Sequence, residues 1–109
     1  MIDPKLYRRT LGHLAGGVTV ITVKAGDLLH GMTASSVCSV SLHPALVLCC
    51  VDHRSRLHSI FQAGEATGFA MNVLRHDQEA WSNHFANIRR LDEDPLRASE
   101  VRFGPSGSP

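Results

Sequence analysis

The chain has 109 residues, enough for one domain with a modest hydrophobic core. Its 11 Lys and Arg against 10 Asp and Glu give a formal net charge of +1, which argues against a protein that binds nucleic acid through bulk positive charge. The longest stretch without Asp, Glu, Lys or Arg, residues 28–51, contains His30, several serines and Pro44, so we do not expect it to span a membrane.

The cysteines and the N-terminus together predict a cytoplasmic protein. The chain has three cysteines, Cys38, Cys49 and Cys50, so they cannot all pair with one another. Two of them are adjacent, a spacing that ordinary disulfide geometry disfavours, so reduced cysteines are expected. The first residues contain no basic stretch followed by an apolar one, so they do not predict a signal peptide.

The first predicted element is a helix that starts at Asp3-Pro4, where the carboxylate caps the helix and the proline takes its first position. Gly16-Gly17 is expected to end it. Its apolar residues recur at helical spacing: Leu6, Tyr7, Leu11 and Leu14.

Five short strands are predicted next, the first two forming a hairpin around Ala25-Gly26-Asp27. The apolar run Ala45–Val51 is expected to be buried on both faces, which would make the thiols of Cys49 and Cys50 inert. The predicted strands are Val18–Val23, Leu28–Thr33, Val37–Leu42, Ala45–Val51 and Gly68–Leu74.

Two further helices are predicted in the second half of the chain. Ser55 is a good cap for a helix through about Ala63, which Gly64 would end, and residues 76–87 have helical spacing. Residues 88–109 predict an irregular tail whose turn-rich end, residues 104–109, adds nothing to a core. This content favours an antiparallel barrel with peripheral helices, a mainly β fold.

Two short motifs could bind a ligand. Residues 31–36, Gly-Met-Thr-Ala-Ser-Ser, combine small side chains with hydroxyls and could lie against a flat heteroaromatic ring; a polar edge strand with a Ser-rich turn is the alternative. Cys50-Val51-Asp52 leads into Arg54-Ser55-Arg56, where a helix N-terminus flanked by arginines could hold a phosphate; an ordinary capped helix with solvated arginines is the alternative.

The histidines predict no metal centre, because their spacing does not match a helical zinc site. His30 and His84 could instead form hydrogen bonds near a ligand. No catalytic acid, base or nucleophile stands out in the sequence.

Four stretches together resemble the short-chain flavin reductases, the small reductase components of two-component flavin-dependent monooxygenases. The order and spacing of the stretches match the family throughout: Tyr7–Thr22, His30–Ser36, Ser39–Asp52, and Phe69–Leu74 leading into His84-Phe85-Ala86.

The resemblance implies an FMN-binding split β-barrel, antiparallel and of Greek-key type, that forms a homodimer. It implies hydride transfer from NADH or NADPH to FMN or FAD, with the reduced flavin supplied to a partner monooxygenase. The implied flavin-contacting residues are Met32, Thr33, Ala34, Ser35 and Ser36, then Cys50, Val51 and Asp52, then Ser55, Arg56 and Leu57 near the phosphate, and finally His84 and Phe85.

Family members continue beyond the point where this sequence stops, into a Gly-Asp-His-like segment associated with nicotinamide binding. We therefore expect residues 1–87 to form the N-terminal part of a split-barrel domain that is incomplete at its C-terminus, with residues 88–109 matching poorly. An impaired nicotinamide site, or one completed by a second subunit, would follow. Two alternatives to a reductase remain open: a non-catalytic flavin- or haem-binding protein on the same barrel, and a protein that only forms dimers.

Overall fold

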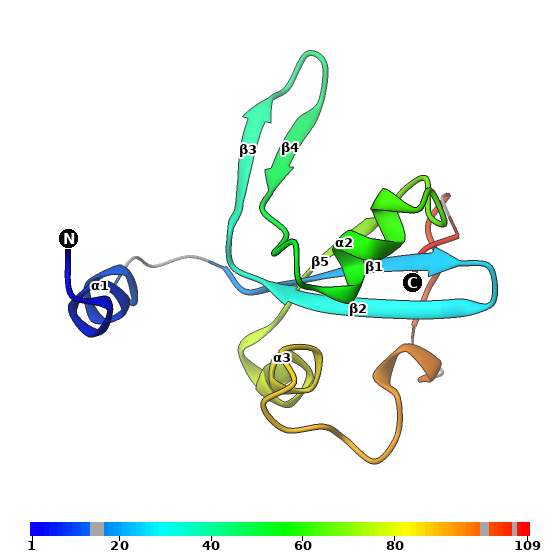
Figure 1. The fold of residues 1–109 in the computed structure, drawn as a ribbon. Helices are drawn as coiled ribbons and strands as arrows, with labels where there is room; N and C mark the ends of the chain where they lie inside the picture. The colour runs from blue at the N-terminus through cyan, green and yellow to red at the C-terminus, as the bar shows by residue number, and fades with distance from the viewer. Residues whose placement is uncertain (14–16, 99–100, 106) are drawn as a thin grey trace.

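The computed structural model describes residues 1–13, 17–98, 101–105 and 107–109. Within these ranges, five strands, three α-helices and two 3₁₀ turns follow one another, and Figure 1 shows their arrangement. In order they are α1 (Pro4–Leu11), β1 (Thr19–Ala25), β2 (Leu28–Ala34), β3 (Val37–Ser41), β4 (Leu46–Cys49), α2 (Arg56–Gln62), β5 (Ala70–Val73), η1 (His76–Gln78), α3 (Glu79–Phe85) and η2 (Pro95–Arg97).

Strand β1 is the centre of a three-stranded antiparallel sheet with the order β2-β1-β5. The predicted hairpin is confirmed: β1 and β2 pair along their whole length, and Gly26 makes the turn with a φ of 62°. β1 is buried from Thr19 through Val23 because it has a strand on each side and packing on both faces.

The two faces of β1 bury different clusters, as the alternation of side chains along a strand requires. Ile21 and Val23 pack with Leu57 and Ile60 of α2. On the opposite face, Val20 packs with Phe85 of α3 and Leu96 of η2. The sheet is therefore covered on one side by α2 and on the other by α3 and η2.

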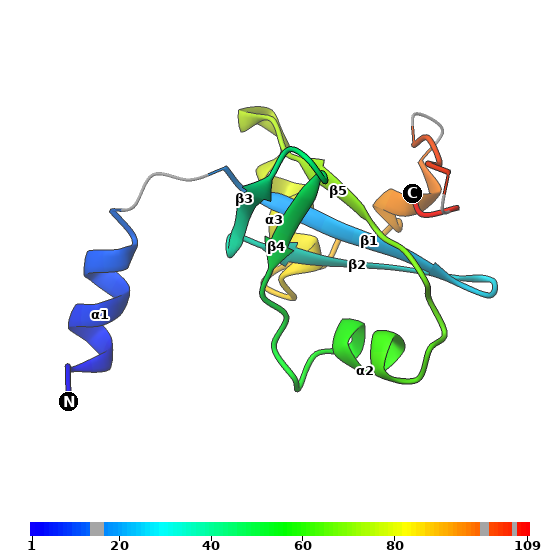
Figure 2. The same ribbon diagram turned by 90° about the horizontal axis from the view of Figure 1, so that it is seen from above.

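Strands β3 and β4 form a separate two-stranded sheet, here called the arm, that rises from the body in Figure 1. In Figure 2, seen from above, the arm overlaps the larger sheet. The prediction that residues 45–51 are buried on both faces is wrong, because β4 pairs only with β3 and no described element covers the arm. The side chains of Leu46, Val47 and Leu48 are 49%, 46% and 52% exposed. Of the two cysteines expected to be buried there, Cys50 is exposed and Cys49 is half-buried.

Antiparallel pairing is thus confirmed, but the described strands do not close into a barrel. They form two sheets instead of one continuous one. The last strand of the larger sheet, β5, pairs with β1 alone among the described residues.

The predicted starts of α1 and α2 are confirmed, whereas the predicted end of α1 is not. Asp3 caps α1 by accepting a hydrogen bond from the backbone of Lys5 (3.3 Å), and Ser55 caps α2 through His58 (3.2 Å). Helix α1 ends at Leu11, with Gly12 as its cap, earlier than predicted. Residues 14–16, which include the predicted Leu14 and Gly16, lie outside the described part of the chain. The predicted last helix begins with the 3₁₀ turn η1.

The end of the chain does contribute to the core, contrary to the prediction. Ser108 is 1% exposed, and the hydroxyl of Thr22 in β1 donates a hydrogen bond to the carbonyl of Pro109. Gly107, with a φ of 78°, turns the chain back toward the sheet. Among the described helices, none is long and apolar enough to cross a membrane.

Candidate functional site

The predicted ligand-binding residues gather along one edge of β2. This strand pairs with β1 on one side and has no described strand on the other. Residues 32–34 lie in β2, and Ser35 and Ser36 follow it. The end of β4 lies beside them, because the backbone N–H of Cys50 donates a hydrogen bond to the carbonyl of Ser36 (3.0 Å).

Part of this set faces α2 and belongs to the hydrophobic core. Ala34 and Leu57 are 6% and 0% exposed, and Met32 and Val51 pack against the same cluster. The side chains of Ala34 and Leu57 therefore fix the position of β2 and of the start of α2, and cannot themselves line an open site.

The other part joins β2 to α3. The hydroxyl of Thr33 donates a hydrogen bond to the carbonyl of Ser82 (2.7 Å). The rings of His84 and Phe85 meet edge to face, with centroids 4.9 Å apart, and Phe85 lies against Gly31. These contacts hold the C-terminal end of α3 at the edge of β2.

The exposed polar residues differ in their freedom to bind a ligand. Asp52 accepts three hydrogen bonds from Arg54, from its backbone N–H (2.8 Å), Nε (3.3 Å) and a terminal nitrogen (3.0 Å), which lower the pKa of the carboxyl to about 2. Arg54 is therefore paired, whereas Ser35, Ser36 and Cys50 are exposed.

A polar cavity of about 320 Å³ lies at the edge of β2, between α2 and the end of α3. It brings together three of the predicted residues, Arg56, His84 and Phe85. Two further lining residues, His30 and Gly31, were also singled out in the sequence. The sequence did not indicate the remaining ones, which are Leu29, Asn87, Arg90, Asp94 and Leu96. The adjacent pair Arg89-Arg90 after a predicted helix is the signal that could have drawn attention to Arg90.

The charges around this cavity are unequal. Arg56 and Arg90 face a single carboxylate, Asp94, which also caps η2 by accepting from the backbone of Leu96 (3.1 Å). Burial, followed by the fields of Arg56 and Arg90, lowers the pKa of His30. A cavity with two guanidinium groups and one carboxylate suits an anionic group.

His84 forms the back of the cavity and is 3% exposed. Its Nδ1 accepts a hydrogen bond from the backbone of Leu91 (2.9 Å). Burial, and then the positive charge of Arg90, lower the pKa of His84, while Asp94 acts in the opposite direction. The imidazole is therefore neutral near pH 7 and fixes the loop after α3.

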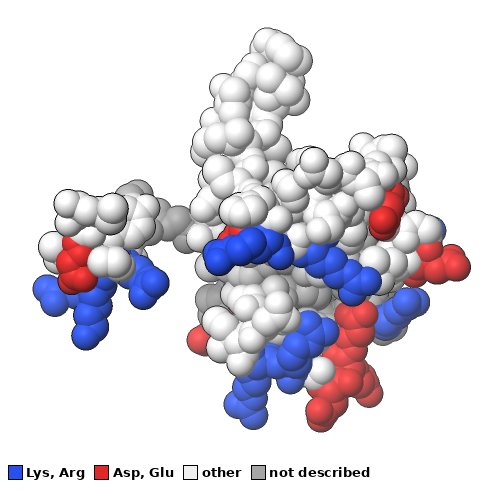
Figure 3. All heavy atoms as spheres, viewed as in Figure 1, with Lys and Arg blue, Asp and Glu red and all other residues white. Residues whose placement is uncertain are grey.

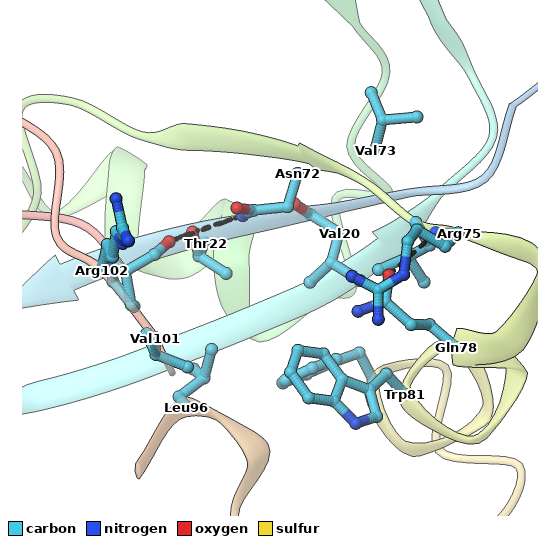
Figure 4. Close-up of a pocket in the computed structure, with 13 residues that line it drawn as sticks. Val20, Thr22, Asn72, Val73, Arg75, Gln78, Trp81, Leu96, Val101 and Arg102 are labelled. Carbon is cyan, nitrogen blue, oxygen red and sulfur yellow. Dashed lines mark hydrogen bonds between the residues drawn. The ribbon is translucent and has the colours of Figure 1, made fainter. Parts of the chain in front are cut away.

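A second cavity, of about 430 Å³, lies on the α3 side of β1 and β5 (Figure 4). Several of its polar groups already have hydrogen-bond or ion-pair partners. The Asn72 amide donates to the Thr22 hydroxyl (3.1 Å), and Arg75 pairs with Asp77 (3.0 Å). Its lining is mainly apolar, with Val20 and Leu96 among the residues, and it also includes the guanidinium group of Arg102.

Metal binding finds no support in the described residues, where no three His, Cys, Asp or Glu side chains gather closely enough to hold an ion.

Comparison with known proteins agrees with this architecture. The family model for the flavin reductase like domain matches residues 11–109. The NADH-dependent FMN reductase AsuE2 of Streptomyces nodosus subsp. asukaensis is 42% identical over 99 residues, covering 90% of this chain and 50% of the relative.

Solved structures match as well. Nitrilotriacetate monooxygenase component B from Mycobacterium thermoresistibile superposes with a TM-score of 0.82 at 32% identity, covering 98% of this chain and 57% of the other. The NADH:FAD oxidoreductase SgcE6 of Streptomyces globisporus, in complex with NAD and FAD fragments, gives 0.73 at 38% identity, covering 98% and 63%.

The chain spans about half the length of the curated relatives it matches. The match nevertheless extends over most of the chain, and its strands and helices superpose on those of solved reductases. This chain therefore belongs to the flavin reductase-like domain family.

Proposed function

We propose that the protein is an NAD(P)H-dependent flavin reductase that binds FMN or FAD along the edge of β2 and supplies reduced flavin to a partner monooxygenase. The observation that carries the proposal is the polarity of this edge. Neutral hydroxyl groups, those of Ser35 and Ser36, lie at one end, and the cationic cavity with Arg56 lies toward the other. A flavin nucleotide has the same polarity, a neutral ring with hydrogen-bonding atoms and an anionic phosphate.

The donor set fits such a ligand. Ser35 and Ser36 are exposed and can offer hydroxyl and backbone donors to the polar rim of a ring, while Arg56 makes no ion pair with any described residue and is available to a phosphate. The bound flavin would accept a hydride from NADH or NADPH. The protein's own part is to orient the ring and hold its polar atoms, and we propose no side chain as an acid or base.

We also propose that the protein works as a homodimer in the cytoplasm, with the arm in its interface. Residues 37–51 contain no Asp, Glu, Lys or Arg, and Figure 3 shows the arm without charged side chains above a body that carries charges of both signs. Apolar side chains exposed on a projecting two-stranded sheet are stabilised when another apolar surface covers them. A second copy of the chain provides such a surface in its own arm.

An anaerobic titration of the purified protein tests the reductase. FMN is added first, and quenching of its fluorescence reports binding; NADH is then added, and loss of the absorbance of oxidised flavin reports hydride transfer. Bleaching of bound FMN at a rate above that of free FMN supports the proposal. Binding without bleaching would instead support a non-catalytic flavin-binding protein, and absence of binding would rule out both.

A further inference from the structure

The segment that follows α3 holds one particular arginine at the cavity beside β2. Asn87 has a left-handed backbone, with a φ of 58°, which turns the chain at the end of the helix. The backbone N–H groups of Ile88 and Arg89 then donate to the carbonyl of Asn83, at 3.0 and 3.3 Å. The backbone N–H of Leu91 donates a hydrogen bond to Nδ1 of His84. The backbone is therefore held by hydrogen bonds on both sides of residue 90.

The side chain of Arg90 is also positioned. One of its terminal nitrogens donates to Oδ1 of Asn87 at 2.8 Å. Four further N–H bonds of the guanidinium remain, and Arg90 forms no ion pair with any described carboxylate. Its neighbour Arg89 does not line the cavity, so of these two adjacent arginines only Arg90 faces it.

Arg90 and Arg56 act on the same space from different elements. Both line the cavity, and the positive field of each reaches His30, which lines the same cavity from β2. Asp94, the one acidic side chain in the lining, already accepts a backbone hydrogen bond through Oδ1. Two guanidinium groups directed at one cavity and left without ion pairs are a typical arrangement for a phosphate.

We propose that Arg90 is a second cationic ligand of the flavin phosphate, acting with Arg56 in the cavity at the edge of β2. This inference rests on the proposed function, because it concerns the part of the proposed flavin site that holds the phosphate. Arg90 lies outside the motif at the start of α2 and is therefore an additional phosphate-binding residue. With both arginines, the protein selects phosphorylated flavins over riboflavin. A phosphate bound in this cavity could also belong to the nicotinamide nucleotide, and the test distinguishes that ligand from the flavin.

Binding of riboflavin and FMN to the intact protein, followed by fluorescence quenching, tests the assignment. The two ligands share the ring and the ribityl chain and differ only in the phosphate. For Arg90→Gln we expect FMN to bind about 10- to 100-fold more weakly, as for the loss of one charge-assisted hydrogen bond. Riboflavin should bind with unchanged affinity, and Arg90→Lys should recover part of the loss.

Arg89→Gln is the matched control, since it makes the same chemical change one residue away and outside the cavity; it should leave both affinities unchanged. Circular dichroism confirms that each variant is folded. Equal weakening of FMN and riboflavin, or no change in either, overturns the assignment while leaving the flavin reductase proposal intact. Weaker binding of NADH with an unchanged FMN to riboflavin ratio also overturns it and assigns the cavity to the nicotinamide nucleotide. Failure of the wild type to bind any flavin overturns the proposed function itself.

Discussion

Gly31 and Phe85 fit so closely that a methyl group added at Gly31 would lie 2.8 Å from both Cδ1 and Cε1 of the Phe85 ring. Gly31 lies within β2 and has an ordinary strand backbone, so the glycine is needed for space and not for an unusual φ. The contact brings the end of α3, with His84, against the strand that carries the ligand-binding edge. The glycine of the motif therefore sets the distance between two parts of the site.

Gly31→Ala should destabilise the protein by about 1–3 kcal/mol, the usual cost of adding a methyl group to a packed interior. The added Cβ would also lie 3.3 Å from Cγ1 of Val20, so two buried neighbours would have to shift to accommodate it. Urea unfolding followed by circular dichroism measures the change. The double variant Gly31→Ala with Phe85→Leu, compared with Phe85→Leu alone, should show a smaller effect of the alanine. An alanine effect of the same size in both backgrounds would show that the Phe85 ring is not the cause.

Thr33→Val should destabilise the protein by about 1 kcal/mol or more, because it leaves the carbonyl of Ser82 without the Thr33 hydroxyl while keeping the shape of the side chain. Thr33→Ser, which keeps the hydroxyl, is the control and should retain most of the stability. The free energy of unfolding measured in urea distinguishes them. If the valine and serine variants lose stability equally, the methyl group of Thr33 matters and the hydrogen bond does not.

The sequence predicts local features of this fold well because neighbouring residues determine them. The Asp3 cap, the turn at Gly26 and the Ser55 cap each depend on a few consecutive residues, and all three are confirmed. The same holds for the strand that begins at Ala70. Because such local signals are readable in the sequence, the residues of the flavin reductase motifs could be assigned to the correct strands and helices.

Features that depend on distant partners were not predictable. The apolar run of β4 predicts burial, but no local pattern indicates that the described elements leave this strand exposed. The cavity at β2 joins His30 of β2, Arg56 of α2 and Arg90 of the loop after α3, so no spacing in the sequence connects them. The burial of Ser108 accompanies the hydrogen bond between its neighbour Pro109 and Thr22 of β1, a distant contact that no local pattern encodes.

Charge on the arm should weaken self-association without unfolding the chain. Val47→Lys combined with Leu46→Lys replaces two side chains that are about half exposed in the single chain, so the cost to the isolated fold is small. In a dimer the same lysines would lose water without gaining a partner. Sedimentation velocity over a range of concentrations should show a shift from dimer to monomer. Ile88→Lys changes a residue that is 75% exposed and outside the arm, and should sediment as the wild type does. An unchanged dimer in the arm variant would exclude the arm from the interface.

The stability of the protein should fall as the pH falls below about 6.5, and His84 should account for part of the decrease. Burial first, and then the charge of Arg90, hold the pKa of His84 below its ordinary value of 6.5, and Nδ1 is an acceptor that a proton would remove. The unfolded chain regains the ordinary pKa, so below pH 6.5 it binds more protons than the native state does. The contribution of His84 is therefore fully present above pH 6.5 and is lost as the pH falls toward the native pKa.

Urea unfolding at pH 8, 7, 6 and 5 tests this dependence on the wild type and on His84→Gln, whose amide does not titrate but can still accept from Leu91. The variant should lose less stability than the wild type between pH 7 and pH 5. A residual slope is expected in both proteins, because burial and the two cavity arginines also lower the pKa of His30. His43→Gln, in the exposed turn of the arm, is the matched control. Parallel curves for the wild type and His84→Gln would show that the buried imidazole does not couple folding to pH, and would remove it as the neutral anchor of the loop that carries Arg90.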